Sequence, residues 1–125
     1  MDANVRGELS RGQTIDITTT GRRTHAPRRI EIVFHNIDGR IYISGMPSRR
    51  TRAWIHNLTD DPRLTIHLKR GVRADIPATA RIITDPAERH AVFEWIARNA
   101  WRNANVEAMD AFSPLIEVTP LDVAA

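Results

Sequence analysis

The 125-residue chain contains no cysteine, and this absence excludes several kinds of chemistry at once. Without thiols there are no disulfides, no thiolate metal ligands and no cysteine nucleophile. The histidines do not replace them, because they show no spacing that places two metal ligands on one helix face. We therefore expect no metal site from the five histidines, which are His25, His35, His56, His67 and His90.

The chain also lacks any apolar stretch approaching the roughly 20 residues that a membrane-spanning helix requires. Its first nine residues include Asp2, Arg6 and Glu8 and have no apolar centre, so they do not resemble a secretory signal. By default we expect a cytoplasmic protein without a membrane span. Because domains cluster near this length, we also expect one domain over residues 1–125.

Lysine is almost absent: Lys69 is the one lysine among 18 basic residues, and the net charge is +3. The planar fork of arginine suits phosphates and carboxylates better than lysine does. An anionic partner and a GC-rich coding sequence both explain such a bias. A nucleic acid would also need aromatic side chains interleaved with the arginines, and the arginine-rich segments lack them. We therefore expect no nucleic-acid partner.

No motif of a serine hydrolase, a P-loop or a zinc protease occurs. Asp85 and Glu94 fall in a predicted helix and have no carboxylate partner in the pattern. The sequence thus predicts no catalytic side chain, and any enzymatic chemistry would come from a cofactor.

Alternating apolar and polar residues predict six strands, separated by turn residues such as Asp38-Gly39. Two helices are expected, one over 49–59 with Ser48 as N-cap and one starting with Asp85 as cap and Pro86 at the first position. Pro77 should place its strand at an edge or a bulge, and His67 should face the surface. The fold class is α+β, mainly β, with an antiparallel sheet that curls into a barrel; the predicted strands are 13–20, 28–35, 40–45, 63–69, 72–84 and 113–121.

The first segment that could carry function reads TTTGRRT from Thr18 to Thr24 and continues with Pro27 and Arg28. A strand that ends in glycine and opens into backbone N–H groups beside guanidinium groups suits an anionic ligand. A solvated basic turn explains the same residues, because charge runs are often simply surface. Both interpretations remain open at this stage.

The second segment reads SGMPSRRTR from Ser44 to Arg52 and leads into the predicted helix. A helix N-terminus can hold a phosphate, and Gly45 would let a flat ligand approach the backbone. Arginines in a first helical turn oppose the helix dipole unless an anion lies nearby. Two roles are open for Trp54, which are stacking on the ring of a ligand and filling the core. Two roles are also open for Asn57, which are capping the turn at Asp60 and anchoring the helix to a strand.

Over residues 18–69 the chain resembles the deazaflavin-dependent nitroreductase family, which uses coenzyme F-420 of actinobacteria. Three motifs in register carry the resemblance: TTTGRRT followed by PR, the hairpin DGRIYISG, and W-x-x-N-L-x-x-x-P. The DPAER segment and the closing SPLIEV are also in the style of the family. The resemblance implies a split β-barrel similar to flavin reductases and pyridoxamine-phosphate oxidases.

The resemblance also implies roles for individual residues. The basic turn would hold the phosphate and acidic tail of the cofactor, the end of the hairpin would lie along its ring, and the following helix would flank the pocket. Pro47 replaces a lysine of some relatives, so its anion contact would pass to the arginines that follow. The implied cofactor-binding residues are Arg22, Arg23, Arg28, Ser44, Gly45, Met46, Arg49, Arg50, Ala53, Trp54 and Asn57, with Arg52 as a further candidate for that anion contact.

The implied activity is transfer of a hydride from reduced coenzyme F-420 to a small conjugated acceptor such as a quinone or an enone. Relatives that reduce nitro compounds have tyrosine-rich substrate walls, whereas Tyr42 is the one tyrosine of this chain. The alternative is a carrier of the same fold that binds a deazaflavin, a flavin or a fatty acid without turnover, and flavin mononucleotide is the alternative cofactor. Split barrels usually pair through their sheets, so the resemblance also implies a homodimer.

Overall fold

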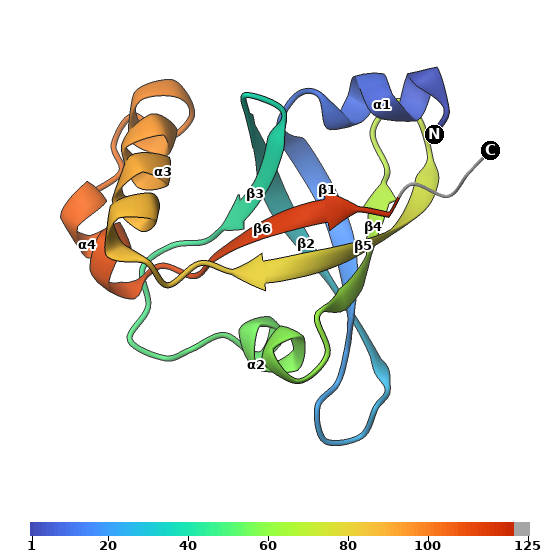
Figure 1. Cartoon of the computed structure of the whole chain (residues 1–125), viewed down its shortest axis with the longest axis horizontal. Helices are drawn as coiled ribbons and strands as arrows, with labels where there is room; N and C mark the ends of the chain where they lie inside the picture. The colour runs from blue at the N-terminus through green and yellow to red at the C-terminus, as the bar shows by residue number, and fades with distance from the viewer. Residues whose placement is uncertain (122–125) are drawn as a thin grey trace.

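Six antiparallel strands close into a barrel in the order β1-β2-β3-β6-β5-β4 (Figure 1). The structure is a computed structural model, and it describes residues 1–121. The split-barrel class that the sequence predicted is confirmed, and each predicted strand is present with slightly different ends. The strands are β1 Gln13–Thr20, β2 Pro27–Ile37, β3 Arg40–Ser44, β4 Arg63–Leu68, β5 Ala74–Ile82 and β6 Leu115–Pro120.

Alternation along the strands builds the core of the barrel. In β1, Ile15 and Ile17 are fully buried while the residues between them are only partly covered. Ile17 pairs with Ile66 of β4, so the apolar faces of neighbouring strands meet inside the ring. The β2–β3 turn consists of Asp38 and Gly39, with φ of 53° and 88°, which is the left-handed geometry that suits a two-residue hairpin.

Strand β5 is paired on both sides, and it tolerates Pro77 because of where this residue lies in the two ladders. Pro77 pairs with Thr65 of β4, while the ladder between β5 and β6 begins one residue later at Ala78. On the β6 side, the Pro77 carbonyl accepts a hydrogen bond from the Leu121 N–H at 2.8 Å. The expected bulge is absent from the described residues, and Pro77 lies at the end of a ladder, where its missing N–H matters least.

Within residues 1–121, four helices accompany the barrel: α1 Ala3–Leu9, α2 Ala53–Asp60, α3 Pro86–Asn99 and α4 Val106–Phe112. α1 and α2 lie at opposite ends of the barrel, and α3 and α4 stand together at its side (Figure 1). The predicted start of α3 is confirmed, because the Asp85 carboxylate accepts a hydrogen bond from the Glu88 N–H at 2.9 Å and Pro86 follows the cap.

Arg89 of α3 holds the helical pair against the barrel. Its guanidinium group donates to the backbone carbonyls of Ile83, Met109, Asp110 and Ser113 at 2.8 to 3.2 Å. These carbonyls belong to the end of β5, to α4 and to the residue that follows α4. One partly buried cation therefore fastens three chain segments.

The helix expected over 49–59 begins later than predicted. Its N-cap is Arg52, and the helix proper starts at Ala53. Ser48 does not cap it; its hydroxyl instead accepts a hydrogen bond from the Arg50 N–H at 3.2 Å within the preceding loop. Arg49 and Arg50 consequently precede the helix rather than opposing its dipole from the first turn.

The sequence did not predict α1. Asp2 caps this short helix by accepting from the Asn4 and Val5 N–H groups, and Leu9 packs into the barrel core. This segment has no apolar centre, and a single buried side chain in seven residues provides little periodicity to detect.

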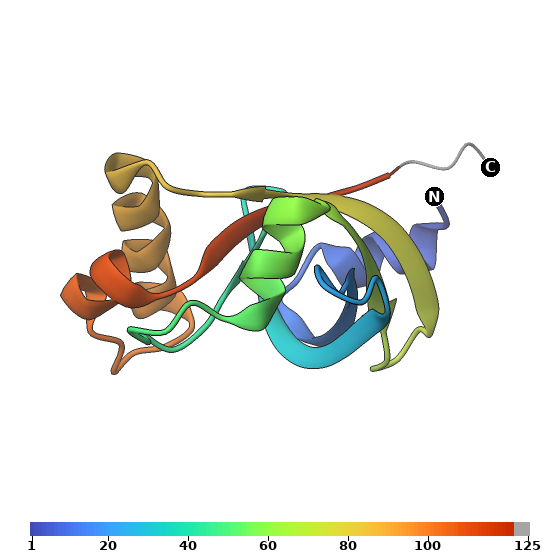
Figure 2. The same cartoon turned by 90° about the horizontal axis from the view of Figure 1, so that it is seen from below.

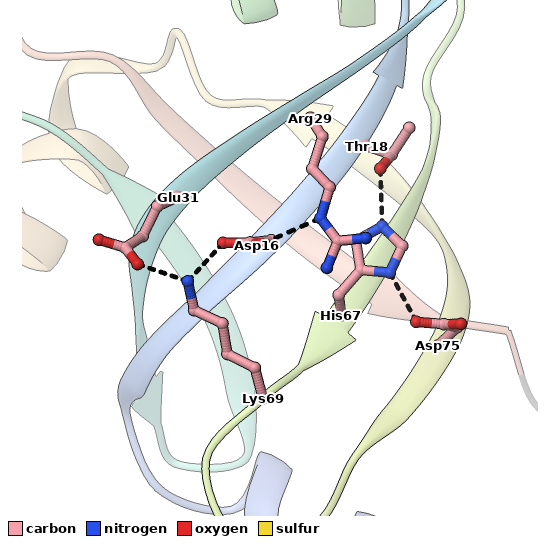
Figure 3. A network of polar contacts seen from close by, with 7 residues as sticks. All are labelled: Asp16, Thr18, Arg29, Glu31, His67, Lys69 and Asp75. Atoms are coloured by element: carbon pink, nitrogen blue, oxygen red, sulfur yellow. Dashed lines mark hydrogen bonds and ion pairs between the residues drawn. The ribbon is translucent and has the colours of Figure 1, made fainter.

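His67 does not lie on an open surface as expected. It points outward from β4, yet it is only 9% exposed, because Thr18 and Asp75 on the flanking strands cover it. Its Nε2 lies 2.6 Å from the Thr18 hydroxyl, and its Nδ1 lies 2.6 Å from the Asp75 carboxylate. Beside this chain of contacts, Lys69 bridges two carboxylates and Arg29 binds one of them (Figure 3). The network ties β2, β1, β4 and β5 together across the outside of the barrel.

Candidate functional site

The turn between β1 and β2 is a tight loop that displays basic side chains. The Gly21 N–H donates to the Ala26 carbonyl, and the His25 N–H donates to the Gly21 carbonyl, each at 2.8 Å. A Cβ at Gly21 would lie 3.0 Å from the Ala26 oxygen, so a larger residue there would press against the other end of the loop. Arg22 and Arg23 occupy the tip and are exposed.

Asn57 fixes helix α2 against this turn. Its Oδ1 accepts a hydrogen bond from the Arg22 N–H at 3.1 Å, and its Nδ2 donates to the Thr19 hydroxyl at 3.1 Å. Of the two roles considered for Asn57, anchoring the helix to a strand is therefore the observed one. The same contact uses the Arg22 N–H, so that group is not free for a ligand.

A cavity of about 550 Å³ lies between the turn and α2, and we call it the hairpin cavity. This size falls within the usual range of small-molecule sites. Six of the eleven predicted cofactor-binding residues line it together, although they come from two distant parts of the sequence. They are Arg22, Arg23, Arg28, Ala53, Trp54 and Asn57. Trp54 is 7% exposed and packs in the barrel core, so filling the core is the role that the structure shows for it, although it also lines the cavity.

The hairpin cavity is rich in unused hydrogen-bond donors. Among residues 1–121, no side chain pairs with the guanidinium groups of Arg22, Arg23 or Arg28. The N-terminus of α2 carries no side-chain cap, so it leaves the N–H groups of Ala53 and Trp54 available. Cationic forks facing a helix N-terminus are well suited to a phosphate or a carboxylate.

The three predicted residues at the end of β3 lie outside the hairpin cavity. Ser44 is buried and donates its hydroxyl to the Pro114 carbonyl at 2.8 Å. Gly45 does not offer an open face, because the Arg52 guanidinium occupies the adjacent space, 3.1 Å from where a Cβ would be. Arg52 in turn donates to the Met46 carbonyl at 2.7 Å and so fastens the loop.

A second cavity of about 360 Å³ lies on the other side of the α2 N-terminus, and we call it the α4 cavity. Arg49 and Arg50 line it together with Phe112 and Ser113 at the end of α4. The Arg49 guanidinium lies 5.6 Å from the centre of the Phe112 ring. Eight of the eleven predicted residues thus divide between two cavities that flank one helix, while Ser44, Gly45 and Met46 line neither. The α4 residues were not predicted as site residues, because the three motifs that carry the resemblance lie within residues 18–69.

Comparison with known proteins connects this geometry with one family. The family model for F420H(2)-dependent quinone reductase matches residues 1–118. The chain belongs to this quinone reductase family. The resemblance found in residues 18–69 is thereby confirmed, and the protein is an oxidoreductase that depends on the reduced deazaflavin. The match gives no support to flavin mononucleotide as the cofactor. No curated protein matches the chain in a sequence search.

Solved structures agree on the fold. A conserved hypothetical protein from Mycobacterium tuberculosis is 19% identical, with a TM-score of 0.71, and the match covers 98% of this chain and 81% of that one. An F420 reductase is 14% identical with a TM-score of 0.68, and the match covers 94% and 93% of the two chains. A FAD-binding protein from Mesorhizobium loti is 12% identical with a TM-score of 0.64, and the match covers 98% and 91%. The quinone reductase family therefore shares its barrel with flavin-binding proteins.

The residues of the hairpin cavity fit an anionic cofactor of this kind. Unpaired guanidinium groups and the free N–H groups at the start of α2 are the donors that a phosphate and a carboxylate tail require. Among residues 1–121, no cluster of acidic or histidine side chains could hold a metal ion, and no helix is long and apolar enough to cross a membrane.

Proposed function

We propose that the hairpin cavity binds the phosphate and acidic tail of reduced coenzyme F-420, and that the chain passes a hydride from it to a quinone. The observation that carries this proposal is the convergence of Arg22, Arg23 and Arg28 with the N-terminus of α2 around one cavity. Reduced deazaflavin supplies two electrons and a proton as a hydride, which with a further proton convert a quinone to a hydroquinone. The chain itself has to position both partners and exclude water.

We further propose that the acceptor enters from the α4 cavity. Its wall combines apolar side chains such as Ile55, Ile82 and Phe112 with four arginines. Asp110 is the one carboxylate among its lining residues, and His90 holds that group at 2.6 Å. An oxygen that gains negative charge as the quinone is reduced would thus face cations rather than acids. Enones develop the same charge and form the wider acceptor class.

The cofactor part of the proposal is tested by Arg23→Ala. A charge-assisted contact contributes on the order of 2 kcal/mol, so we expect roughly thirtyfold weaker binding of the coenzyme in a fluorescence titration. Arg73→Ala removes an exposed arginine far along the chain in the β4–β5 connection and serves as the control. Equal affinity of the Arg23 variant and the wild type for the coenzyme would show that the hairpin cavity is not the coenzyme site.

The acceptor part is tested by steady-state kinetics with a water-soluble quinone. Phe112→Ala should raise the KM for the quinone and leave the binding of the coenzyme unchanged. Arg23→Ala should instead weaken the binding of the coenzyme and leave the KM for the quinone unchanged. If reduced coenzyme is bound but not consumed in the presence of the quinone, the chain is a carrier instead. The expected homodimer is tested separately by sedimentation, and we propose that each chain acts as a single domain within it.

A further inference from the structure

Two large apolar side chains are left exposed on two segments that adjoin each other, and one of them, Phe112, lines the α4 cavity. Met46 is 68% exposed and Phe112 is 45% exposed. They belong to segments far apart in the sequence, which a hydrogen bond from the Ser48 N–H to the Phe112 carbonyl at 3.1 Å joins. The one other large exposed apolar side chain among residues 1–121 is Leu121, which directly follows β6 and donates its N–H to Pro77 of β5.

Cations without acidic partners surround this apolar pair. Arg49 stacks on the Phe112 ring, and Arg50 is exposed; among the described residues neither forms an ion pair. Asp110 is the nearest carboxylate along α4, and its pairing with His90 leaves the arginines unneutralised. The basic β1–β2 turn lies on the same face of the molecule as α2 and the loop before it (Figure 2). The loop before α2 and the end of α4 therefore carry two exposed apolar side chains together with two arginines that have no acidic partner among the described residues.

We propose that Met46, Arg49, Arg50 and Phe112 form a patch that docks on an anionic lipid surface. Two apolar side chains are too few for a stable protein interface, which typically buries about 800 Å² on each partner. They suffice to enter the headgroup layer when flanking arginines bind lipid phosphates. The inference rests on the proposed function in one respect: a hydrophobic quinone dissolved in the bilayer could then reach the α4 cavity without crossing water.

The test is co-sedimentation with vesicles in the absence of cofactor and quinone. With vesicles of phosphatidylcholine containing about a third phosphatidylglycerol, we expect the protein to bind and to be released as salt is raised. With pure phosphatidylcholine we expect at least tenfold weaker binding. The Met46→Ser/Phe112→Ser double variant should lose at least tenfold in binding, and so should the Arg49→Gln/Arg50→Gln variant.

Two matched controls separate the patch from general stickiness and net charge. Leu121→Ser removes an apolar side chain of the same exposure, 45%, as Phe112, and Arg70→Gln/Arg73→Gln removes the same charge from the β4–β5 connection. Both should bind vesicles as the wild type does. Failure of the wild type to bind, or equal losses in patch and control variants, would overturn the proposal. Self-association through the patch without vesicle binding would also overturn it. Since neither cofactor nor quinone is present, such a failure would leave the proposed function standing.

Discussion

The Asn57 side chain reaches across the hairpin cavity to the backbone of Arg22, with 3.1 Å between Oδ1 and the N–H. A buried amide therefore connects helix α2 directly to the basic turn. Because the turn carries the arginines and α2 carries the free N–H groups, this contact sets the geometry of the proposed anion site.

Asn57→Leu should disturb both stability and binding. The substitution removes two hydrogen bonds and leaves the Arg22 N–H and the Thr19 hydroxyl without their partner, which costs about 2 kcal/mol of unfolding free energy. We expect a lower urea midpoint together with weaker coenzyme binding. Asn99→Leu provides the control, because Asn99 is exposed and bonds only within its own helix. If the Asn57 variant loses stability but binds the coenzyme with unchanged affinity, the basic turn does not need the Asn57 contact to reach its binding position.

Arg89→Met should be among the most destabilising single substitutions. The variant deletes the cation that satisfies four backbone carbonyls and lies 5.1 Å from the centre of the Phe93 ring, so we expect a loss of about 3 kcal/mol in urea unfolding. Arg98→Met is the matched control: Arg98 lies on the same helix, is 76% exposed and only approaches Glu94. Similar small effects in both variants would contradict the role assigned to Arg89.

The polar network on the barrel should make stability fall in acid. Lys69 and then Arg29 hold the pKa of Asp16 below its ordinary value of 3.8. A carboxylate with a lowered pKa in the folded state contributes stability above its unfolded pKa, and this contribution is lost as the pH falls through the folded value. We expect the urea midpoint to drop below about pH 4, and Asp16→Asn to flatten that drop. Asp38→Asn, in the hairpin turn, should leave the drop as it is in the wild type.

His35 should add a second loss at milder acidity. Burial lowers the pKa of His35 from 6.5, and among residues 1–121 its Nε2 has no hydrogen-bond partner. The neutral form is the one that folds, so stability present above pH 6.5 should decrease as the pH falls below it. His35→Phe should reduce this decrease, as followed by the fluorescence of Trp95 and Trp101, which contact the imidazole edge-on. If the stability of the His35→Phe variant depends on pH in the same way as that of the wild type, His35 is not the source of this loss.

His90 provides an internal comparison, because its pKa is raised whereas that of His35 is lowered. Hydrogen bonding to Asp110 raises the pKa of His90 above 6.5, so protonation favours the folded state. The stability that it contributes is fully present below the unfolded pKa and is lost as the pH rises through the folded value. His90→Gln should therefore lower stability at pH 6 more than at pH 9. The contact is half-exposed, so the effect should be small.

The barrel could be predicted because its determinants are local. Alternation fixes which residues of a strand face the core, and Asp38-Gly39 fixes one register. The start of α2 was misplaced because a loop rich in arginine and serine resembles a capped first turn. His67 shows a further limit: alternation gives the face of a strand residue but not whether side chains on the neighbouring strands cover it.

The candidate site was predictable where its residues lie close together in the sequence. The TTTGRRT and W-x-x-N motifs, together with Arg28 and Ala53, predicted the walls of the hairpin cavity, and six of the predicted residues do meet there. The contacts that organise the site join distant segments, such as Asn57 with Arg22 and Ser48 with Phe112. No local pattern reports such pairs, so the separation of Arg49 and Arg50 from the hairpin cavity became visible only in three dimensions.

The place of β6 in the barrel has a consequence for how the chain reaches its native state. This strand follows every other strand in the sequence, yet it pairs with both β3 and β5. During synthesis the ring must therefore wait for β6, and two unpaired strand edges stay open to misassociation until it arrives. A nascent chain halted before Leu115 should consequently depend on chaperones far more than the finished protein.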